Sequence, residues 1–314
     1  MENKITEFSN ASEKLSLALI SIWNEPILRL RCESILENRT VESNNKKEFY
    51  NSNCKEPWQV ILWCYCSLNT KGSSKASKDW TKRDKFKEMT ELFQTFIFSN
   101  SNYNDSQKFV AINIILRNFA GGKFLTINKG LIADIYLKKT EELTTSLLHD
   151  KIMSVNSFNL SDYENKSTKA DSWNLFQLLR ECNFDVNEIK KKFQKLSIID
   201  STEKNLGELK GLSKKYSRNI KMDMRTSDSE NFIAIDLRIN KILNRIGLNF
   251  NIEKKYNEIE IFFIKNVIED KLSEVILPSY SSRPTNLKGI TPWELDRLIY
   301  NLGEENLLEL YIPN

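Results

Sequence analysis

The sequence predicts an all-α fold, and three observations support this prediction. The 314-residue chain contains only 9 glycines and 6 prolines, so residues that separate short strands are scarce. Apolar residues recur at helical spacing: Ile235, Ile239, Ile242 and Ile246 lie at i, i+4, i+7 and i+11 of one stretch. Runs with the alternating period of a strand are few. The length allows one large lobe or two smaller ones.

In the first half of the chain, apolar periodicity predicts helices separated by polar stretches. Ser12 is a candidate N-cap, because a serine side chain can accept a hydrogen bond from a free N–H group of the first turn. Residues 67–78 and 154–172 are polar and lack a helical period, so we predict loops there. The predicted helices cover residues 15–23, 57–66, 86–98, 109–119 and 131–148.

The second half contains two clear helix boundaries. Gly247 is expected to end the isoleucine-striped helix, because glycine adopts the left-handed conformation that follows many last turns. The sequence TPWE at 291–294 is a capping box with proline at the first helical position, and its helix is expected to run to Gly303. Further helices are predicted for residues 173–182, 186–196 and 255–272.

The composition excludes several classes of enzyme. His149 is the only histidine, which excludes zinc sites and hydrolases that need two or more. The glycine-rich phosphate loops of nucleotide-binding proteins are also missing from the sequence. The five cysteines are odd in number and form no repeated pair, which favours buried thiols in a reducing compartment. We therefore expect no metal and no cofactor.

The bulk properties are typical of a water-soluble globular protein, with 40% hydrophobic and 28% charged residues. The first residues, MENKITEFSNASEK, are polar, and no apolar run approaches the ~18 residues of a membrane span. We expect no signal peptide, no membrane partner and a cytoplasmic location, nucleoid-associated if the protein is bacterial or archaeal. The net charge of +4 is compatible with a nucleic-acid partner without indicating one.

The distribution of charge is more informative than its sum. Residues 188–221 contain ten Lys or Arg and four Asp or Glu. This basic stretch surrounds the sequence LKGLSKKYSRN at 209–219, in which Gly211 allows a tight turn and Leu212 can plug the turn into a core. Ser213 and Lys214 would then begin a helix whose free N–H groups form an anion site. Phosphate of DNA suits such a hairpin.

Two residues of this region are candidates for chemistry. Lys215 lies on the first turn of the predicted helix, and Asp236 follows 21 residues later, where the isoleucine-striped helix begins. Each has a simpler interpretation. A lysine in a basic helix is commonly solvated surface, and an aspartate at a helix start is a good N-cap.

Taken together, LKGLSKKYS and AIDLRINKILNRIGL resemble the helix-hairpin-helix base-excision DNA glycosylases, the superfamily of endonuclease III and the 8-oxoguanine glycosylases. The family pattern is roughly L-P-G-V-G-x-K-T-A, followed about twenty residues later by V-D-T-H-V-x-R-V-x-N-R-L-G-L. Gly211 matches the first hairpin glycine, Lys215 the catalytic lysine and Asp236 the catalytic aspartate. The end of the second block is matched by Asn244, Arg245, Gly247 and Leu248.

The resemblance is specific over residues 206–248 and has departures. Ser213 stands where the family has its second hairpin glycine, and Leu237-Arg238 stands where the family has Thr-His. The four-cysteine cluster of endonuclease III is missing, which places the chain nearer the cluster-free glycosylases. Residues 291–303 look like the closing helix of some members, and residues 63–70 are similar to the segment that supplies a wedge residue, here Asn69. Residues 82–171 do not align.

The resemblance implies a fold of two helical lobes with DNA in the cleft between them. One lobe would combine residues 1–55 with 225–314. The other would comprise residues 56–224 and end in the helix-hairpin-helix motif at about 206–221. A monomer acting on double-stranded DNA with a damaged or modified base is expected.

The resemblance also implies roles for individual residues. The Lys215 amine would attack the sugar C1′ and form a Schiff base, while Asp236 stabilises the oxocarbenium-like transition state. Three tryptophans could stack on the extruded base, although buried aromatic residues are more often plain core: Trp58, Trp63 and Trp293. The expected DNA contacts are Lys210, Gly211, Leu212, Ser213, Lys214, Arg218, Arg238 and Asn69.

The base to be excised is left open by the sequence. Similarity to the cluster-free lysine/aspartate members favours an oxidised purine such as 8-oxoguanine. A modified base of invading phage DNA is an alternative, because the unaligned middle could build an unusual pocket. A second alternative is a non-catalytic DNA-binding protein that kept the hairpin, and Ser213 favours it. A third alternative is an all-helical interaction protein that matches the family pattern by chance.

Overall fold

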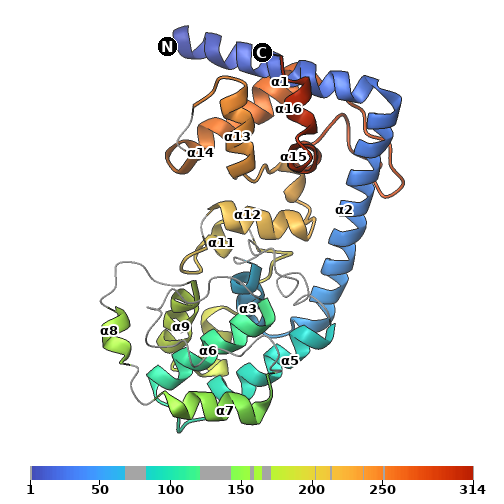
Figure 1. Ribbon diagram of the computed structural model, residues 1–314. Coiled ribbons are helices and arrows are strands. Elements are labelled where there is room, and N and C mark those ends of the chain that lie inside the picture. Colours follow the sequence, from blue (N-terminus) through green and yellow to red (C-terminus); the bar gives the residue numbers. More distant parts are fainter. Residues whose placement is uncertain are drawn as a thin grey trace. The chain divides into compact units, whose positions relative to one another are not determined.

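The computed structural model describes residues 2–67, 83–120, 143–155, 159–164, 171–201, 203–212, 214–235, 237–249 and 252–313. Within these ranges every regular element is a helix (Figure 1). The predicted all-α class is therefore confirmed for the described part of the chain. No described helix combines the length and the hydropathy that crossing a lipid bilayer requires.

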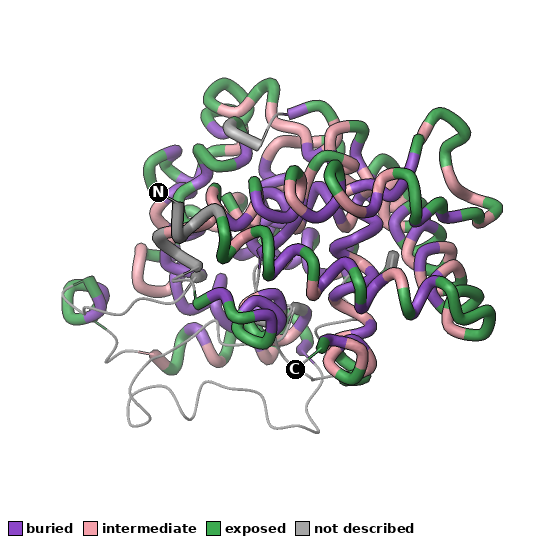
Figure 2. The backbone as a smooth tube through the Cα atoms, turned by 90° about the horizontal axis from the view of Figure 1, so that it is seen from above, coloured by how far each residue is buried: buried purple, intermediate pink, exposed green. Residues whose placement is uncertain are grey.

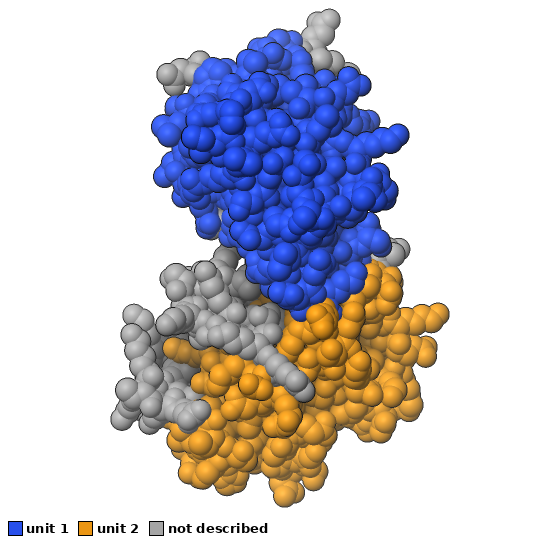
Figure 3. Space-filling model, turned by 90° about the vertical axis from the view of Figure 1, so that its right-hand side faces the viewer, with its two compact units in different colours: residues 1–47, 221–314 blue, residues 48–220 orange. Residues whose placement is uncertain are grey.

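The chain divides into two compact units (Figure 3). Unit 1 comprises residues 1–47 and 221–314, and unit 2 comprises residues 48–220. The lobes predicted from the sequence had their boundaries at 55/56 and 224/225. The boundaries between the units fall inside two helices, α2 (Pro26–Asn53) and α12 (Lys214–Asp223).

Unit 1 is built around a core contributed by both ends of the chain. The apolar face of α1 (Glu2–Asn24), which includes Leu15 and Leu19, packs against η4, a π-helix with Phe262 and Phe263 buried on it. Trp293 is buried in the same core. The other elements of the unit, besides the first part of α2 and the end of α12, are η3 (Ser229–Asn231), α13 (Leu237–Arg245), α14 (Ile252–Ile261), η4 (Phe262–Leu272), α15 (Pro292–Glu304) and α16 (Leu307–Tyr311).

Unit 2 has an aromatic core. Buried and exposed positions follow one another along the helices of the chain (Figure 2). Phe109 lies at the centre of one cluster, with the rings of Trp173 and Phe176 5.3 and 5.2 Å away. The described elements are the end of α2, α3 (Pro57–Ser67), α5 (Arg83–Phe93), η1 (Gln94–Phe98), α6 (Asp105–Ala120), α7 (Thr145–Ser154), α8 (Leu160–Glu164), α9 (Asp171–Glu181), α10 (Val186–Lys192), α11 (Glu203–Gly207) and the start of α12.

The N-terminal helices differ from the prediction. Ser12 does not cap a helix: α1 begins at Glu2, and the Ser12 hydroxyl donates to the Ser9 carbonyl one turn earlier, 2.9 Å away. The long helix α2 was not predicted. Most of its residues are polar, and its apolar side chains do not gather on one strong face, so the sequence carries little periodicity there.

Two predicted helices contain π-helical segments. The helix predicted at 255–272 consists of α14 followed by the π-helix η4, and the one at 86–98 of α5 followed by the π-helix η1. In η4, Phe262, Val267 and Leu272 recur every five residues, and all three are buried. This spacing suits the wider turn of a π-helix, in which each N–H group bonds to the carbonyl five residues earlier.

Several helix boundaries in the structure differ from those predicted from the sequence. The helix predicted at 131–148 is described only from residue 143, and α7 begins at Thr145 with Thr144 as its N-cap. The predicted loop at 154–172 contains the short helix α8, and α10 ends at Lys192, four residues before the predicted end. The capping box is confirmed, with reciprocal hydrogen bonds between Thr291 and Glu294.

Candidate functional site

The hairpin between α11 and α12 is a tight, well-packed turn. Helix α11 ends at Gly207, and α12 begins at Lys214. Leu206, Leu209 and Leu212 are all buried, and the Leu212 N–H donates to the Leu209 carbonyl at 2.9 Å. These three buried leucines therefore anchor the turn in the core, while Lys210 and Gly211 remain at the surface.

Gly211 is required at its position for two reasons. Its φ is +87°, a conformation that residues with a side chain rarely adopt. A Cβ atom there would also lie 2.4 Å from Nδ2 of Asn174, a residue of α9. No residue other than glycine fits this turn without a shift.

A buried tyrosine holds the residue before this glycine. The hydroxyl of Tyr65, in α3, donates to the carbonyl of Lys210 at 2.5 Å. Tyr65 is fully buried, while Lys210 and Gly211 are exposed. Sequence reasoning missed this contact, because 145 residues separate its partners.

The cations of α12 differ in their exposure. Lys214 is exposed, and Lys215 is half-buried with Nζ 5.7 Å from the centre of the Tyr216 ring. Arg218 was expected as a surface contact to phosphate, but it is only 6% exposed. Lys221 is 1% exposed, and its Nζ lies 3.0 Å from a carboxylate oxygen of Asp228. The helix thus presents cations on its first turn and buries those that follow.

Part of the basic surplus of this region is neutralised by neighbouring carboxylates. At the end of α10, Lys190, Lys191 and Lys192 form ion pairs with Glu56, Glu188 and Glu181 at 3.3, 2.6 and 2.9 Å. The sequence count did not include Glu56 and Glu181, which lie outside the stretch. The cationic surface is therefore smaller than the sequence suggested.

Asp236 lies outside the described residues, but the chain on both sides of it is well held. Ile233, Ala234 and Ile235 are buried, and the Ala234 N–H donates to a carboxylate oxygen of Asp296 at 3.0 Å. The hydroxyl of Tyr256 donates to the Ile233 carbonyl at 3.0 Å. Helix α13 begins at the next residue, Leu237.

Helix α13 ends as predicted. Gly247 has φ of +93°, and the Leu248 N–H donates back to the Leu243 carbonyl at 2.8 Å. This bond satisfies a carbonyl group of the last turn. The described segments before and after Asp236 are therefore held by hydrogen bonds within unit 1.

The predicted meeting of Lys215 and Asp236 stays a prediction. Lys215 belongs to unit 2, and Asp236 falls in the range of unit 1. Ser213 and Asn69 also lie outside the described residues, as does the side chain of Arg238.

The three candidate tryptophans are buried in their units. The Trp58 ring lies 5.1 Å from that of Phe98, and the Trp63 ring lies 5.5 Å from that of Tyr50. Trp293 is completely buried and donates from Nε1 to the Met222 carbonyl at 3.1 Å. All three pack as core residues, the alternative that the sequence left open.

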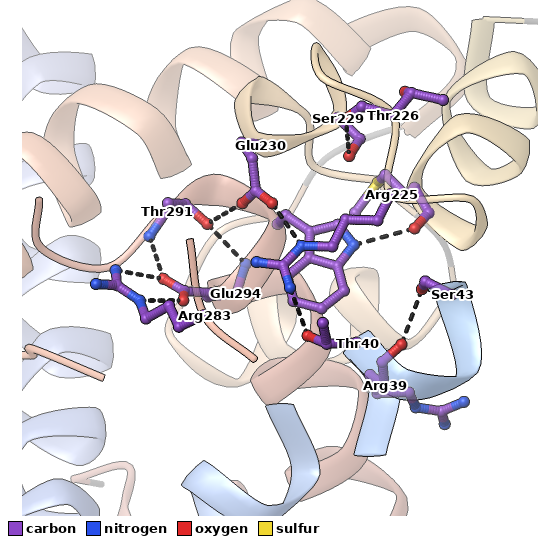
Figure 4. A network of polar contacts seen from close by, with 12 residues as sticks. Arg39, Thr40, Ser43, Arg225, Thr226, Ser229, Glu230, Arg283, Thr291 and Glu294 are labelled. Carbon is purple, nitrogen blue, oxygen red and sulfur yellow. Dashed lines mark hydrogen bonds and ion pairs between the residues drawn. The ribbon is translucent and has the colours of Figure 1, made fainter. Parts of the chain in front are cut away.

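Sequence reasoning missed a polar network that includes Arg225, Glu230 and Glu294 (Figure 4). The guanidinium of Arg225 lies 4.4 Å from the centre of the Trp293 ring, and Arg225 itself has φ of +41°. Its Nε donates to Glu230 at 2.7 Å, and another nitrogen donates to Thr40 at 2.5 Å. Arg225 therefore connects α2 to the segment that follows α12.

The capping-box glutamate is the second centre of this network. Glu294 is fully buried, and one of its oxygens accepts from Nε of Arg283 at 2.7 Å. Tyr280 donates to the same oxygen at 3.0 Å. Burial and the nearby Glu294 raise the pKa of Tyr280, so its hydroxyl stays protonated and remains a donor. The network is satisfied internally and has a structural role.

The described cysteines are poor nucleophiles, because burial disfavours the thiolate. It raises the pKa of Cys64 to about 12, and it raises the pKa of Cys66 as well. In the described ranges, no group of three or more His, Cys, Asp or Glu side chains could hold a metal ion.

Comparisons with protein-family models, curated proteins and solved structures found no match for this chain. The functional interpretation therefore depends on the hairpin, on Lys215 and on the sequence pattern that extends to Leu248.

Proposed function

We propose that this protein is a DNA glycosylase with AP lyase activity, which extrudes a damaged or modified base and excises it through a Schiff base on Lys215. The observation that best supports the proposal is the order of elements around the hairpin. A glycine-dependent turn at Gly211 leads into α12, and Lys215 lies on the first turn of that helix.

The hairpin has the chemistry of a phosphate-binding element. The first N–H groups of an α-helix lack carbonyl partners, and the helix dipole places partial positive charge there. The exposed Lys214 adds a full charge at this end of α12. A DNA phosphate can therefore be held by backbone donors and a cation, without base recognition.

The reaction assigned to Lys215 needs its neutral amine. The target nucleotide leaves the duplex stack, at a cost of a few kcal/mol. The amine attacks C1′, the bond from C1′ to the base breaks, and the electron pair leaves with the base. After loss of the amine proton and opening of the sugar ring, the imine makes the C2′ protons acidic. Loss of one C2′ proton forms the C2′–C3′ double bond and expels the 3′ phosphate by β-elimination. Asp236 stabilises the positive charge that develops on the sugar.

Borohydride trapping tests this proposal directly. Borohydride reduces the imine to a stable covalent adduct between protein and DNA. The wild-type protein should form this adduct with its substrate duplex, and Lys215→Ala should not. Lys214→Ala is the matched control, because it removes the adjacent lysine and should weaken binding while keeping the adduct at saturating DNA. An undiminished adduct with Lys215→Ala would remove this lysine from the mechanism.

The substrate is assigned by resemblance to an oxidised purine such as 8-oxoguanine. A panel of duplexes with different modified bases, scored for base release and strand scission, tests this assignment. Preference for a modified pyrimidine typical of phage DNA would favour a role in antiviral defence. Asp236→Asn, run on the best substrate, should lower the rate of base release by at least 10²-fold if its carboxylate stabilises the transition state.

A non-catalytic DNA-binding protein is the second candidate. Ser213 in place of a hairpin glycine and the burial of Trp58, Trp63 and Trp293 favour it. This candidate predicts salt-dependent duplex binding without base release, strand scission or adduct on any substrate of the panel.

A further inference from the structure

The peptide between Lys210 and Gly211 has an unusual environment. Its carbonyl accepts a hydrogen bond from the buried hydroxyl of Tyr65 at 2.5 Å. No cis peptide bond occurs in the described residues, so the Gly211 N–H points away from that carbonyl. Gly211 is exposed, and its N–H donates to no backbone carbonyl in the described ranges.

A second side chain limits the position of this peptide. Asn174 lies against Gly211, so close that a Cβ atom could not be accommodated. Asn174 belongs to α9, and Tyr65 belongs to α3, which packs against α9 within unit 2. The turn is therefore held by two helices of one core, which set the orientation of the Lys210–Gly211 peptide before any ligand arrives.

We propose that Tyr65 is a positioning residue for DNA binding: its hydroxyl fixes the Lys210–Gly211 peptide so that the Gly211 N–H faces a DNA phosphate. The inference rests on the proposed function. Tyr65 does not touch the DNA, because it is completely buried. Its contribution is pre-organisation, since a donor that is already oriented loses less freedom on binding.

The test is Tyr65→Phe, which removes one hydroxyl and keeps the ring. Tyr50→Phe is the matched control: Tyr50 is also buried in unit 2, and its hydroxyl accepts from the Ile198 N–H at 3.1 Å, outside the hairpin. Duplex affinity is measured by fluorescence anisotropy over a range of salt concentrations. Single-turnover adduct formation is measured at saturating DNA.

We expect Tyr65→Phe to raise the Kd about fivefold to tenfold, the factor that corresponds to about one hydrogen bond. The rate of adduct formation at saturating DNA should be unchanged, because the hydroxyl that is removed bonds to Lys210 in the turn, whereas Lys215 lies on the helix that follows. The salt dependence should also be unchanged, since no cation is removed, whereas Lys214→Ala should reduce its slope by about 0.9. Tyr50→Phe should bind as wild type does.

Two outcomes would overturn the inference alone while the wild-type protein still binds and cleaves DNA. In one, Tyr65→Phe binds as wild type does. In the other, Tyr50→Phe weakens binding equally, which would mean that loss of stability is responsible. Failure of the wild-type protein to bind duplex DNA would instead overturn the proposed function and this inference with it.

Discussion

Substitution of Gly211 by alanine tests the geometry on which the hairpin depends. At φ of +87° an alanine is strained by about 1–2 kcal/mol relative to glycine. Its Cβ would also lie 2.4 Å from Nδ2 of Asn174, and moving that side chain away costs about 1 kcal/mol. We therefore expect Gly211→Ala to lower the free energy of unfolding by about 2–3 kcal/mol.

Urea denaturation monitored by tryptophan fluorescence measures this loss, and a double-mutant cycle separates its two causes. Asn174→Ala combined with Gly211→Ala removes the overlap but leaves the backbone strain, so about 1 kcal/mol should be regained. Gly207→Ala is the control, because Gly207 has no positive φ and its nearest non-neighbouring atom would be 3.9 Å from a Cβ. If Gly211→Ala unfolds at the same urea concentration as Gly207→Ala, the assigned turn geometry is wrong.

Three further predictions concern unit 1. Asp228→Asn should lower the free energy of unfolding by about 1–3 kcal/mol, because it removes the carboxylate that pairs with the buried ammonium of Lys221. Urea denaturation measures this loss, and a loss below about 0.5 kcal/mol would contradict the role assigned to the ion pair. Thr291→Ala should cost about 1 kcal/mol through loss of the N-cap bond of α15, while Thr291→Ser should retain most of it. The N–H of Ser282 and neighbouring donors lower the pKa of Glu37. This carboxylate therefore contributes stability above its unfolded pKa, and that stability is lost as the pH falls through its folded pKa. The difference in stability between wild type and Glu37→Gln should shrink on acidification below pH 4.5, and a constant difference would show that the contact is absent.

The sequence predicted those features whose cause is local. Helix α3 follows from a continuous apolar run, the capping box from a four-residue pattern, and the end of α13 from Gly247. Each of these depends on residues within a few positions of one another. Helix α2 lacks such a signal, because its polar residues are not confined to one face.

The parts that could not be predicted depend on residues that are distant in the sequence. The bond from Tyr65 to Lys210 and the contacts of Arg225 with Thr40 and Trp293 join segments that no local pattern connects. Burial of Arg218 is another case, since an arginine in a basic stretch has the same local sequence whether it is exposed or packed. The sequence therefore predicted the candidate site as a motif, whereas the contacts that support it could be identified only from the folded structure.

The discontinuous composition of unit 1 has a consequence for synthesis on the ribosome. The apolar face of α1 emerges early, but its main packing partner, η4, is translated more than two hundred residues later. Unit 2 is a continuous segment that can fold in the meantime, whereas α1 must wait with Leu15 and Leu19 uncovered. Nascent chains stalled before residue 262 should therefore bind chaperones through their first helix, and release should follow once η4 has left the exit tunnel.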